Sequence, residues 1–303
     1  MKIIYSYGNL IGAESRFLRF KENSNFEIKL AAPWHYSKNI KNVNWVVDPL
    51  YVDKKSIKSI LGFDPEIFAN VNLFSSILKE VEKFEPDLII SDYDRYFPII
   101  ARFFNIKHYN ISPLNFLIFG YMLPTRYKSF LLKVKRKIKK IEDGSYFIYS
   151  PFYNFPYKMG QNFKWIKPFH KKYNSEMKDY VVYNPNNKEY LNNVINSLNL
   201  KKNELETAKW VLLNGTTDEI ADVIFNSKAR MATTLDFSDP ELIMNSALIE
   251  EFGIGDSIGN IDILGRNCLN YFEKSFEKVN NFEIKNDEKT LTEIIKMEFK
   301  DKL

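Results

Sequence analysis

The sequence predicts an α/β protein with two domains, each built on a parallel sheet. Short apolar segments alternate with segments of helical spacing along both halves of the 303-residue chain, and a polar stretch near 173–180 separates the halves. The apolar segments are continuous rather than alternating, which is typical of strands covered by helices on both faces. A chain of 303 residues also has room for two domains of ordinary size.

In the first half the predicted strands are short apolar runs, and the predicted helices repeat apolar residues every three or four positions. The strands are expected at 2–7, 26–32, 43–47, 87–91 and 108–111. The helices are expected at 14–21, 67–84 and 98–104, and Pro86 ends the second of them.

Between 123 and 172 this alternation is interrupted by what we predict to be a basic and aromatic insertion, with a helix at 128–141. The alternation then resumes, with strands expected at 180–183, 210–213 and 230–234. The helices of this part are expected at 188–198, 217–225, 240–251, 269–279 and 290–299. We therefore place the first domain at 1–172, the second at 181–285 and a C-terminal helical segment at 286–303.

The composition excludes several classes of protein. With 45% hydrophobic and 27% charged residues, the chain is neither disordered nor a repeat of the collagen type. Its single cysteine, Cys268, excludes an internal disulfide and a cysteine-built zinc site, and it fits a reducing compartment. No apolar run reaches the ~18 residues that cross a bilayer, and the first residues lack the pattern of a signal peptide. We therefore expect a cytoplasmic protein.

The net charge of +5 is concentrated in one segment, since 126–172 contains thirteen Lys and Arg against two acidic residues. Helix 128–141 carries much of this charge and also has an apolar stripe, formed by Leu131, Val134, Ile138 and Ile141. A basic patch of this kind usually faces an anionic partner. The residues expected to contact it are Lys133, Arg136, Lys137 and Lys140.

Three interpretations of this helix are open. Its apolar stripe favours an anionic membrane surface, and hence a peripheral position at the inner face of a membrane. The same charges, followed by an aromatic-rich segment at 146–157, would also suit nucleic acid. The plainest alternative is a solvated helix that packs on its own domain.

Two loops follow predicted strands of the first half and contain candidate catalytic carboxylates. One is the glycine loop 8–12, which leads into a helix that carries Glu14, and the other contains Asp92 and Asp94. In open α/β sheets the ligand lies at the carboxyl ends of the strands, so both loops should border a site. Asp92 and Asp94 are also spaced to hold a divalent cation on a diphosphate, or one of them caps the next helix.

The turn 214–217 has the same position in the second half, between a predicted strand and a predicted helix. Asn214, Gly215, Thr216 and Thr217 would offer hydroxyl and backbone N–H groups at a helix N-terminus, where phosphate groups bind readily. Thr217 could equally be a plain helix cap. The three histidines have no metal-ligand spacing, so we predict no metal site.

Five segments carry a resemblance to a known family. In the first half they are 8–16, a glycine loop that ends in Arg16, and 86–92, with the sequence Pro-Asp-Leu-Ile-Ile-Ser-Asp. In the second half they are 181–185, 215–229 and 241–255. In this order and spacing they resemble the two-domain GT-B glycosyltransferases, in particular the group of the peptidoglycan GlcNAc transferase and the UDP-glucuronosyltransferases.

The resemblance implies two Rossmann-like domains that face a cleft and transfer a sugar from a nucleotide sugar, here a UDP-sugar, with no metal or other cofactor. It assigns the donor to Gly12, the turn 214–217, Asp222, Glu241 and Asn245, with Asp222 on the ribose. The histidine that often acts as the base in the family is Ala13 here. We therefore expect the base to be Asp94, Asp92 or Glu14, in that order.

Acceptor and activity stay open at this stage. A membrane lipid is favoured as the acceptor by the apolar stripe, and hydroxylated bases of DNA are the alternative. Because Ala13 replaces the family histidine, a non-catalytic protein that binds nucleotide sugars is a further alternative. A metal-dependent transferase that uses Asp92 and Asp94 is another.

Overall fold

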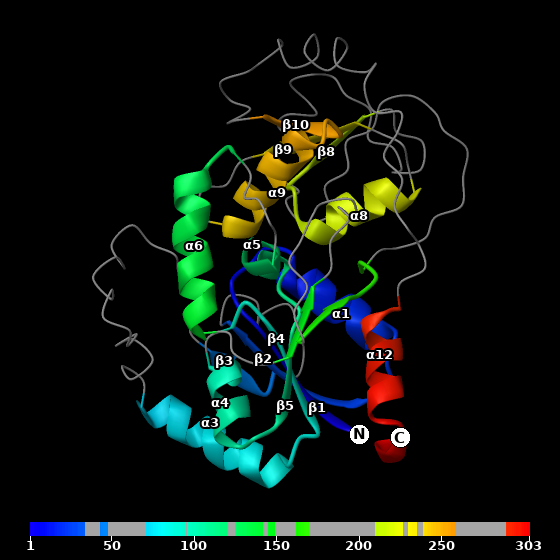
Figure 1. Ribbon diagram of the computed structural model, residues 1–303. Coiled ribbons are helices and arrows are strands. Elements are labelled where there is room, and N and C mark those ends of the chain that lie inside the picture. The colour runs from blue at the N-terminus through cyan, green and yellow to red at the C-terminus, as the bar shows by residue number, and fades with distance from the viewer. Residues whose placement is uncertain are drawn as a thin grey trace.

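The computed structural model describes residues 1–33, 43–47, 71–94, 96–119, 125–141, 145–148, 162–169, 210–226, 230–234, 239–258 and 289–303. These residues form two parallel sheets, a larger and a smaller one, that lie one above the other in Figure 1. The two-domain α/β fold predicted from the sequence is confirmed. The predicted elements at 180–183, 188–198 and 269–279, and both predicted domain boundaries, lie outside the described residues.

The first sheet has the strand order β3-β2-β1-β4-β5-β6-β7, with all neighbours parallel. Its strands are β1 (Lys2–Tyr7), β2 (Glu27–Pro33), β3 (Trp45–Val47), β4 (Leu88–Asp92), β5 (Lys107–Asn110), β6 (Ser145–Ile148) and β7 (Phe163–Trp165). The order reverses between β1 and β4, because β2 lies on one side of β1 and β4 on the other. In open α/β sheets ligands bind at this reversal, outside the carboxyl ends of the strands.

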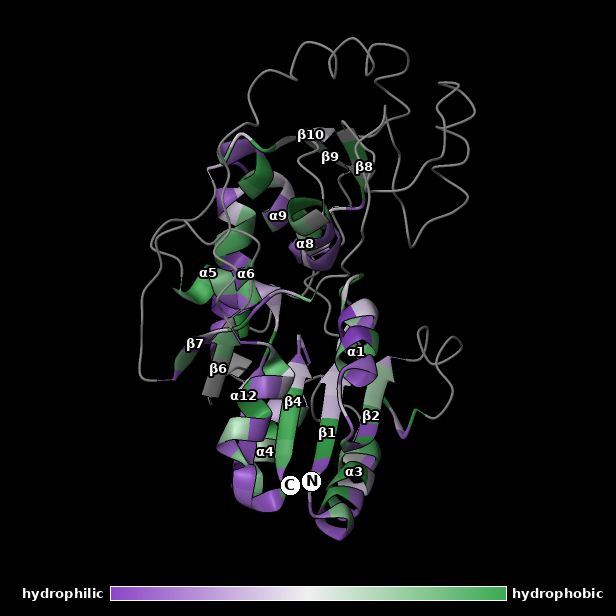
Figure 2. Cartoon of the chain, turned by 90° about the vertical axis from the view of Figure 1, so that its right-hand side faces the viewer, coloured by the Kyte–Doolittle hydropathy of each residue, from purple (hydrophilic) through white to green (hydrophobic). Residues whose placement is uncertain are grey.

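The two faces of the first sheet have separate cores. Alternate residues of β1 point to opposite faces, so that Ile3 and Tyr5 belong to one buried cluster and Ile4 to the other. The helices of this domain are α1 (Ala13–Glu22), α3 (Val71–Phe84), α4 (Phe97–Phe103), the 3-10 turn η2 (Pro113–Asn115), α5 (Phe116–Phe119) and α6 (Lys128–Ile141). Helices α3 and α4 cover the face of Ile4, and α1 and α6 contribute to the other cluster. Figure 2 shows β4 as hydrophobic along most of its length.

The second sheet contains β8 (Trp210–Leu213), β9 (Arg230–Thr234) and β10 (Gly255–Ile258), which are parallel in the order β10-β9-β8. Helices α8 (Thr217–Asn226) and α9 (Pro240–Glu251) follow β8 and β9. Apolar residues of these elements, such as Val211, Ile220 and Leu248, belong to the same buried cluster as Ile3 and Tyr5. The two domains therefore share one continuous apolar core on this face.

Three strands were not predicted: β10 in the second sheet, and β6 and β7 in the segment 123–172. Strands β6 and β7 extend the first sheet beyond β5, so the described parts of this segment belong to the domain rather than to a separate insertion. They are only four and three residues long and rich in aromatic residues. A run this short does not show a strand period by itself.

The C-terminal helix α12 (Leu291–Glu298) packs on the first sheet rather than on the second domain. Leu291, Ile294 and Ile295 join the shared core, and Glu298 pairs with Lys107 and Lys164. The Tyr109 hydroxyl donates a hydrogen bond of 2.5 Å to the same carboxylate. The chain thus returns to the first sheet, and both termini lie at the same end of the molecule (Figure 1).

Candidate functional site at the domain junction

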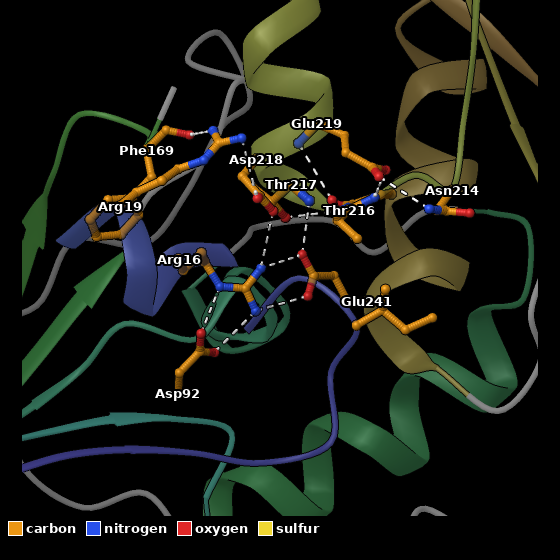
Figure 3. A network of polar contacts seen from close by, with 12 residues as sticks. Arg16, Arg19, Asp92, Phe169, Asn214, Thr216, Thr217, Asp218, Glu219 and Glu241 are labelled. Carbon is orange, nitrogen blue, oxygen red and sulfur yellow. Dashed lines mark hydrogen bonds and ion pairs between the residues drawn. The ribbon is translucent and has the colours of Figure 1, made fainter. Parts of the chain in front are cut away.

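The strand reversal of the first sheet faces the second domain. The loop after β1 and the loop after β4 meet there, where the Gly8 N–H donates a hydrogen bond of 2.9 Å to the Asp92 carbonyl. Helix α1 starts at this edge, and the N-termini of α8 and α9 approach it from the second domain (Figure 3). This is where the sequence predicted a site between the domains.

A completely buried guanidinium group lies at the centre of the junction. Arg16 is 0% exposed, and its Nε donates a hydrogen bond of 2.6 Å to Asp92 Oδ2 in its own domain. Its two Nη atoms donate to both carboxylate oxygens of Glu241 in the second domain, at 2.8 and 3.0 Å. Arg16 therefore joins the end of β4 to the start of α9 (Figure 3).

A second arginine of the same helix makes a parallel connection. Arg19 donates hydrogen bonds of 2.9 and 2.7 Å to the two oxygens of Asp222 in α8, and one of 2.8 Å to the Phe169 carbonyl. Arg16 and Arg19 are three residues apart, which places them on one face of the helix. Just before the helix, the Ile11 N–H donates to Asp239 Oδ2 at 2.8 Å. Residues 11–19 thus reach the second domain at three points.

The turn before α8 is hydrogen-bonded to carboxylates of this chain. The N–H groups of Gly215 and Thr216 donate to Glu219 Oε2 at 3.0 and 3.2 Å, and the Glu219 N–H donates to the Thr216 hydroxyl. This reciprocal pattern is a capping box, and its Thr-x-x-Glu signal at 216–219 is present in the sequence. The Thr217 N–H donates to Glu241 Oε1 at 2.8 Å. These are the N–H groups that the sequence assigned to a diphosphate.

The turn is held in shape from α9. Asn245 Nδ2 donates to the Gly215 carbonyl at 2.8 Å and to the Thr217 hydroxyl at 3.0 Å. Gly215 has a φ of +97°, which an L side chain adopts only with strain. Gly12 is required by space, because a Cβ on it would lie 2.5 Å from Arg16 Nη1 and 3.0 Å from Thr216 Cβ.

The predicted donor residues are thus brought together, and nearly all of them are buried. Gly12, Gly215, Thr216, Thr217, Asp222, Glu241 and Asn245 are buried, whereas Asn214 is half-buried and donates to Glu219. Residues at the junction that the sequence did not single out as site residues are Arg16, Arg19, Asp218, Glu219 and Asp239. The spacing of the two arginines and the capping-box pattern were the available signals.

Negative charge is in excess at this junction. The buried carboxylates here are those of Asp92, Asp218, Glu219, Asp222, Asp239 and Glu241. Two guanidinium groups lie among them and form ion pairs with Asp92, Asp218, Asp222 and Glu241. Burial, followed by the neighbouring Asp218, raises the pKa of Glu219 to about 7. Burial, followed by Glu241, raises the pKa of Asp239 to about 7. Protons are therefore held here at a pH where ordinary carboxyl groups have lost them.

The three candidate bases have different surroundings. The carboxylate of Asp92 is held by Arg16, and Asp94 Oδ2 accepts the N–H groups of Tyr96 and Phe97 at 2.9 and 2.6 Å, at the start of α4. Both are buried. Glu14 is half-buried, and this burial raises the pKa of its carboxyl group. Among the described residues, no group of three or more His, Cys, Asp and Glu is arranged to hold a metal ion.

The apolar stripe of α6 packs inside the protein. Leu131, Val134 and Ile138 are buried in the shared core, so they cannot insert into a lipid surface, and the reason for favouring a membrane is overturned. Lys133 and Arg136 are exposed and Lys137 is half-buried, while the side chain of Lys140 lies outside the described ones. Within the described parts of the chain, no helix is long and apolar enough to cross a membrane.

The excess of buried carboxylates gives a testable pH dependence. A carboxyl group whose pKa is raised in the folded state keeps a proton that the unfolded chain releases, so stability is lost as the pH rises from about 4.5 toward 7 and beyond. Glu219→Gln keeps an acceptor oxygen but carries no charge. We expect the free energy of unfolding of the variant to gain about 2 kcal/mol relative to the unmodified protein between pH 5.5 and 8.5.

Urea unfolding of both proteins at the two pH values measures this difference. Asp301→Asn, which removes an exposed carboxylate at the C-terminus, is the control and should leave the difference near zero. A Glu219→Gln difference that is the same at both pH values would show that Glu219 is ionised throughout.

Comparison with known proteins relates this architecture to a known fold. Neither a protein-family model nor a curated protein sequence matches the chain. Solved structures do: SsfS6, a glycosyltransferase of Streptomyces sp. SF2575, has a TM-score of 0.57 at 11% identity, with 99% of each chain covered. A UDP-glucosyltransferase from Polygonum tinctorium that is capable of glucosylating indoxyl has a TM-score of 0.58 at 9% identity, covering 90% of this chain and 88% of that chain.

LpCGTa, solved in complex with UDP, has a TM-score of 0.51 at 10% identity, covering 91% of this chain and 90% of that chain. Identities this low indicate a shared fold but do not show a shared activity. The strand order, the two facing domains and these similarities together establish that the chain has the GT-B fold of nucleotide-sugar glycosyltransferases.

Proposed function

We propose that this protein transfers a sugar from a nucleotide sugar to an acceptor hydroxyl, in the crevice between its two domains. The observation that carries the proposal is the meeting of α1 and the residue before it with the second domain: Gly12 lies against Thr216 of the turn 214–217, and Arg19 and Arg16 of the helix bind Asp222 and Glu241. These residues come from distant parts of the sequence and gather at the strand reversal of a GT-B fold. Open α/β sheets bind their ligands at this position.

The donor would be held by the second domain. In this proposal Asp222 binds the ribose, the turn 214–217 with the N-terminus of α8 faces the diphosphate, and Glu241 and Asn245 face the sugar. Backbone N–H groups at a helix start stabilise the negative charge that develops on a departing diphosphate. UDP is the proposed nucleotide, because one of the structurally similar proteins was solved with it. We propose that no metal is needed, since Asp92 and Asp94 are engaged by Arg16 and by backbone N–H groups.

The base must accept the proton of the acceptor hydroxyl as the anomeric carbon is attacked. Of the three candidates we propose Glu14, because its carboxylate is half-exposed and, within the described structure, has no hydrogen bond or ion pair. Burial raises the pKa of this carboxyl group toward the pH at which a base works best. Proton transfer of this kind contributes about 10²–10⁴-fold to a rate.

The exposed basic face of α6 is our proposed contact for the acceptor. With the apolar face of the helix buried, only charge remains to attract a partner, and this favours a nucleic acid over a lipid surface. In this proposal the sugar is transferred to the hydroxyl groups of hydroxylated bases in DNA. A location at the inner face of a membrane is the competing outcome of the test below.

A protein that binds nucleotide sugars without transferring the sugar is the second candidate. It is favoured by Ala13, which stands at the position of the histidine that often acts as the base in the family. Slow hydrolysis of a nucleotide sugar to free sugar and nucleoside diphosphate would indicate the enzyme, and its absence in the presence of tight nucleotide binding would indicate the binding protein.

A nucleotide that binds the folded protein raises its melting temperature by mass action. We expect millimolar UDP to raise it measurably, and Asp222→Asn to lose most of this shift because the ribose loses a charged acceptor. Differential scanning fluorimetry across a UDP titration measures both, with Asp301→Asn as the control that keeps the full shift. The donor assignment fails if no nucleoside diphosphate or nucleotide sugar stabilises the unmodified protein.

Two matched variants distinguish between the candidate bases Glu14 and Asp94. We expect Glu14→Gln to lower turnover at least 10²-fold and to leave the UDP-induced shift in melting temperature intact, because it removes only the proton acceptor. Asp94→Asn keeps an oxygen that accepts the N–H groups at the start of α4, and should stay within a few-fold of the unmodified rate. The reverse order would assign the base to Asp94. Product formation is measured with and without EDTA, and activity that is lost in EDTA would contradict metal independence.

The acceptor surface is tested with two pairs of lysine and arginine residues. Lys133→Ala with Arg136→Ala removes two exposed charges from α6, and Lys79→Ala with Lys83→Ala removes two from the exposed side of α3. Gel shifts with duplex DNA across a salt series should show weaker binding for the α6 pair. The slope of the logarithm of the binding constant against the logarithm of the salt concentration should become less steep, by the amount expected for the loss of roughly two phosphate contacts. The α3 pair should match the unmodified protein. Flotation with anionic liposomes but no gel shift would assign the surface to a membrane, and binding to neither would leave α6 a solvated helix.

A further inference from the structure

Residues 11–19 are joined to the second domain by hydrogen bonds from three residues. Ile11 donates to Asp239, Arg16 to Glu241 and Arg19 to Asp222. Each partner lies in the second domain: Asp239 and Glu241 at the start of α9, and Asp222 in the middle of α8. We call these connections of residues 11–19 the charge latch.

The charge latch occupies the same carboxylates that the proposed function gives to the donor. Asp222 and Glu241 are both 0% exposed, and each has both carboxylate oxygens on an arginine. Thr216, whose N–H belongs to the proposed diphosphate turn, is also 0% exposed, and the start of α1 lies directly against it. A donor cannot reach these groups while α1 stays in place.

We propose that the charge latch holds the crevice closed and that donor binding requires its release, so that α1 competes with the nucleotide for the second domain. The inference rests on the proposed function, because it takes Asp222 and Glu241 to be donor ligands. Opening would turn the arginine-bearing face of α1 and the carboxylate-bearing starts of α8 and α9 toward the crevice.

The physical reason for a reversible latch is the balance of buried ion pairs. The free-energy cost of taking two charges out of water is nearly as large as the free energy gained from their attraction. A buried ion pair whose charges are hydrated again on opening therefore contributes little net free energy to holding two surfaces together. The excess of carboxylates lowers this net free energy further: Asp218 lies 3.7 Å from Arg16 and 3.8 Å from Arg19, but it also repels the carboxylates of Asp92 and Glu219.

The latch is tested without any ligand by the reactivity of a thiol at the junction. In a Cys268→Ser background, Thr216→Cys places a thiol that is covered while α1 is in place, and Ala232→Cys in β9 places one that only unfolding of the second domain exposes. We expect Arg19→Gln to raise the labelling rate of the first thiol at least tenfold and to leave that of the second within twofold. Lys21→Gln, which removes a charge from the exposed side of the same helix, should change neither rate.

Two results of the labelling would overturn the latch. Equal acceleration at both thiols would show that Arg19 stabilises the second domain as a whole. An unchanged rate at Thr216→Cys would show that Arg19 does not keep the crevice closed.

The competition with nucleotide is tested by the affinity for UDP, measured by titration calorimetry. A closed state that must open first reduces the apparent affinity by the fraction of protein that is open. We therefore expect Arg19→Gln to bind UDP at least fivefold more tightly than the unmodified protein. Weaker binding by Arg19→Gln would make Arg19 a donor ligand and overturn the competition. If no nucleotide binds any variant although labelling responds as expected, the proposed function fails and the latch stands.

Discussion

The buried guanidinium group of Arg16 is the constraint on which the arrangement of the two domains depends. A charge taken out of water must be paired and hydrogen-bonded, or its burial costs several kcal/mol. Arg16 meets this requirement with one carboxylate from each domain, Asp92 at the end of β4 and Glu241 at the start of α9. The positions of α1, of the loop after β4 and of α9 are therefore linked through a single side chain. Removing either carboxylate would leave a buried charge half-paired.

The same junction carries more negative than positive charge, and this has consequences for how rigid it is. Six carboxylates around two arginines cannot all be ionised at low cost, and the raised pKa values of Glu219 and Asp239 express this. The individual hydrogen bonds and ion pairs of such a junction favour the closed arrangement, whereas repulsion among its carboxylates opposes it. The junction is therefore suited to opening, whereas the apolar core that continues from β1 to β8 supplies a connection that does not depend on charge.

The chain has the GT-B fold, and the turn that the family resemblance assigned to the donor is hydrogen-bonded within the chain. The glycine loop and the turn before α8 are where the resemblance placed them, but their N–H groups face carboxylates of this chain. Asp94 stabilises the start of α4 through the N–H groups of Tyr96 and Phe97. The two arginines of α1 make the charged contacts between the domains here. Their contacts lie 225 and 203 positions away in the sequence.

The sequence by itself determined the strands and helices, because their signals are local. The apolar runs of β1 and β4 and the spacing of α3, α6 and α9 predicted these elements within a few residues. Strands β6 and β7 escaped prediction, since runs of four and three residues contain no readable period and are strands only because β5 offers an edge to pair with.

The site was predictable only in part. Spacing and turn chemistry indicated which residues lie at the carboxyl ends of strands and at helix starts, and the structure gathers them at the junction of the two domains. Tertiary structure alone decided their partners: that the apolar stripe of α6 faces the protein core, that Asp222 and Glu241 meet arginines, and that Glu14 stays half-exposed. The reason is physical. The periodicity of a sequence indicates whether a face of a helix or strand is apolar or charged. Which group contacts that face depends on the packing of elements that are far apart in the chain.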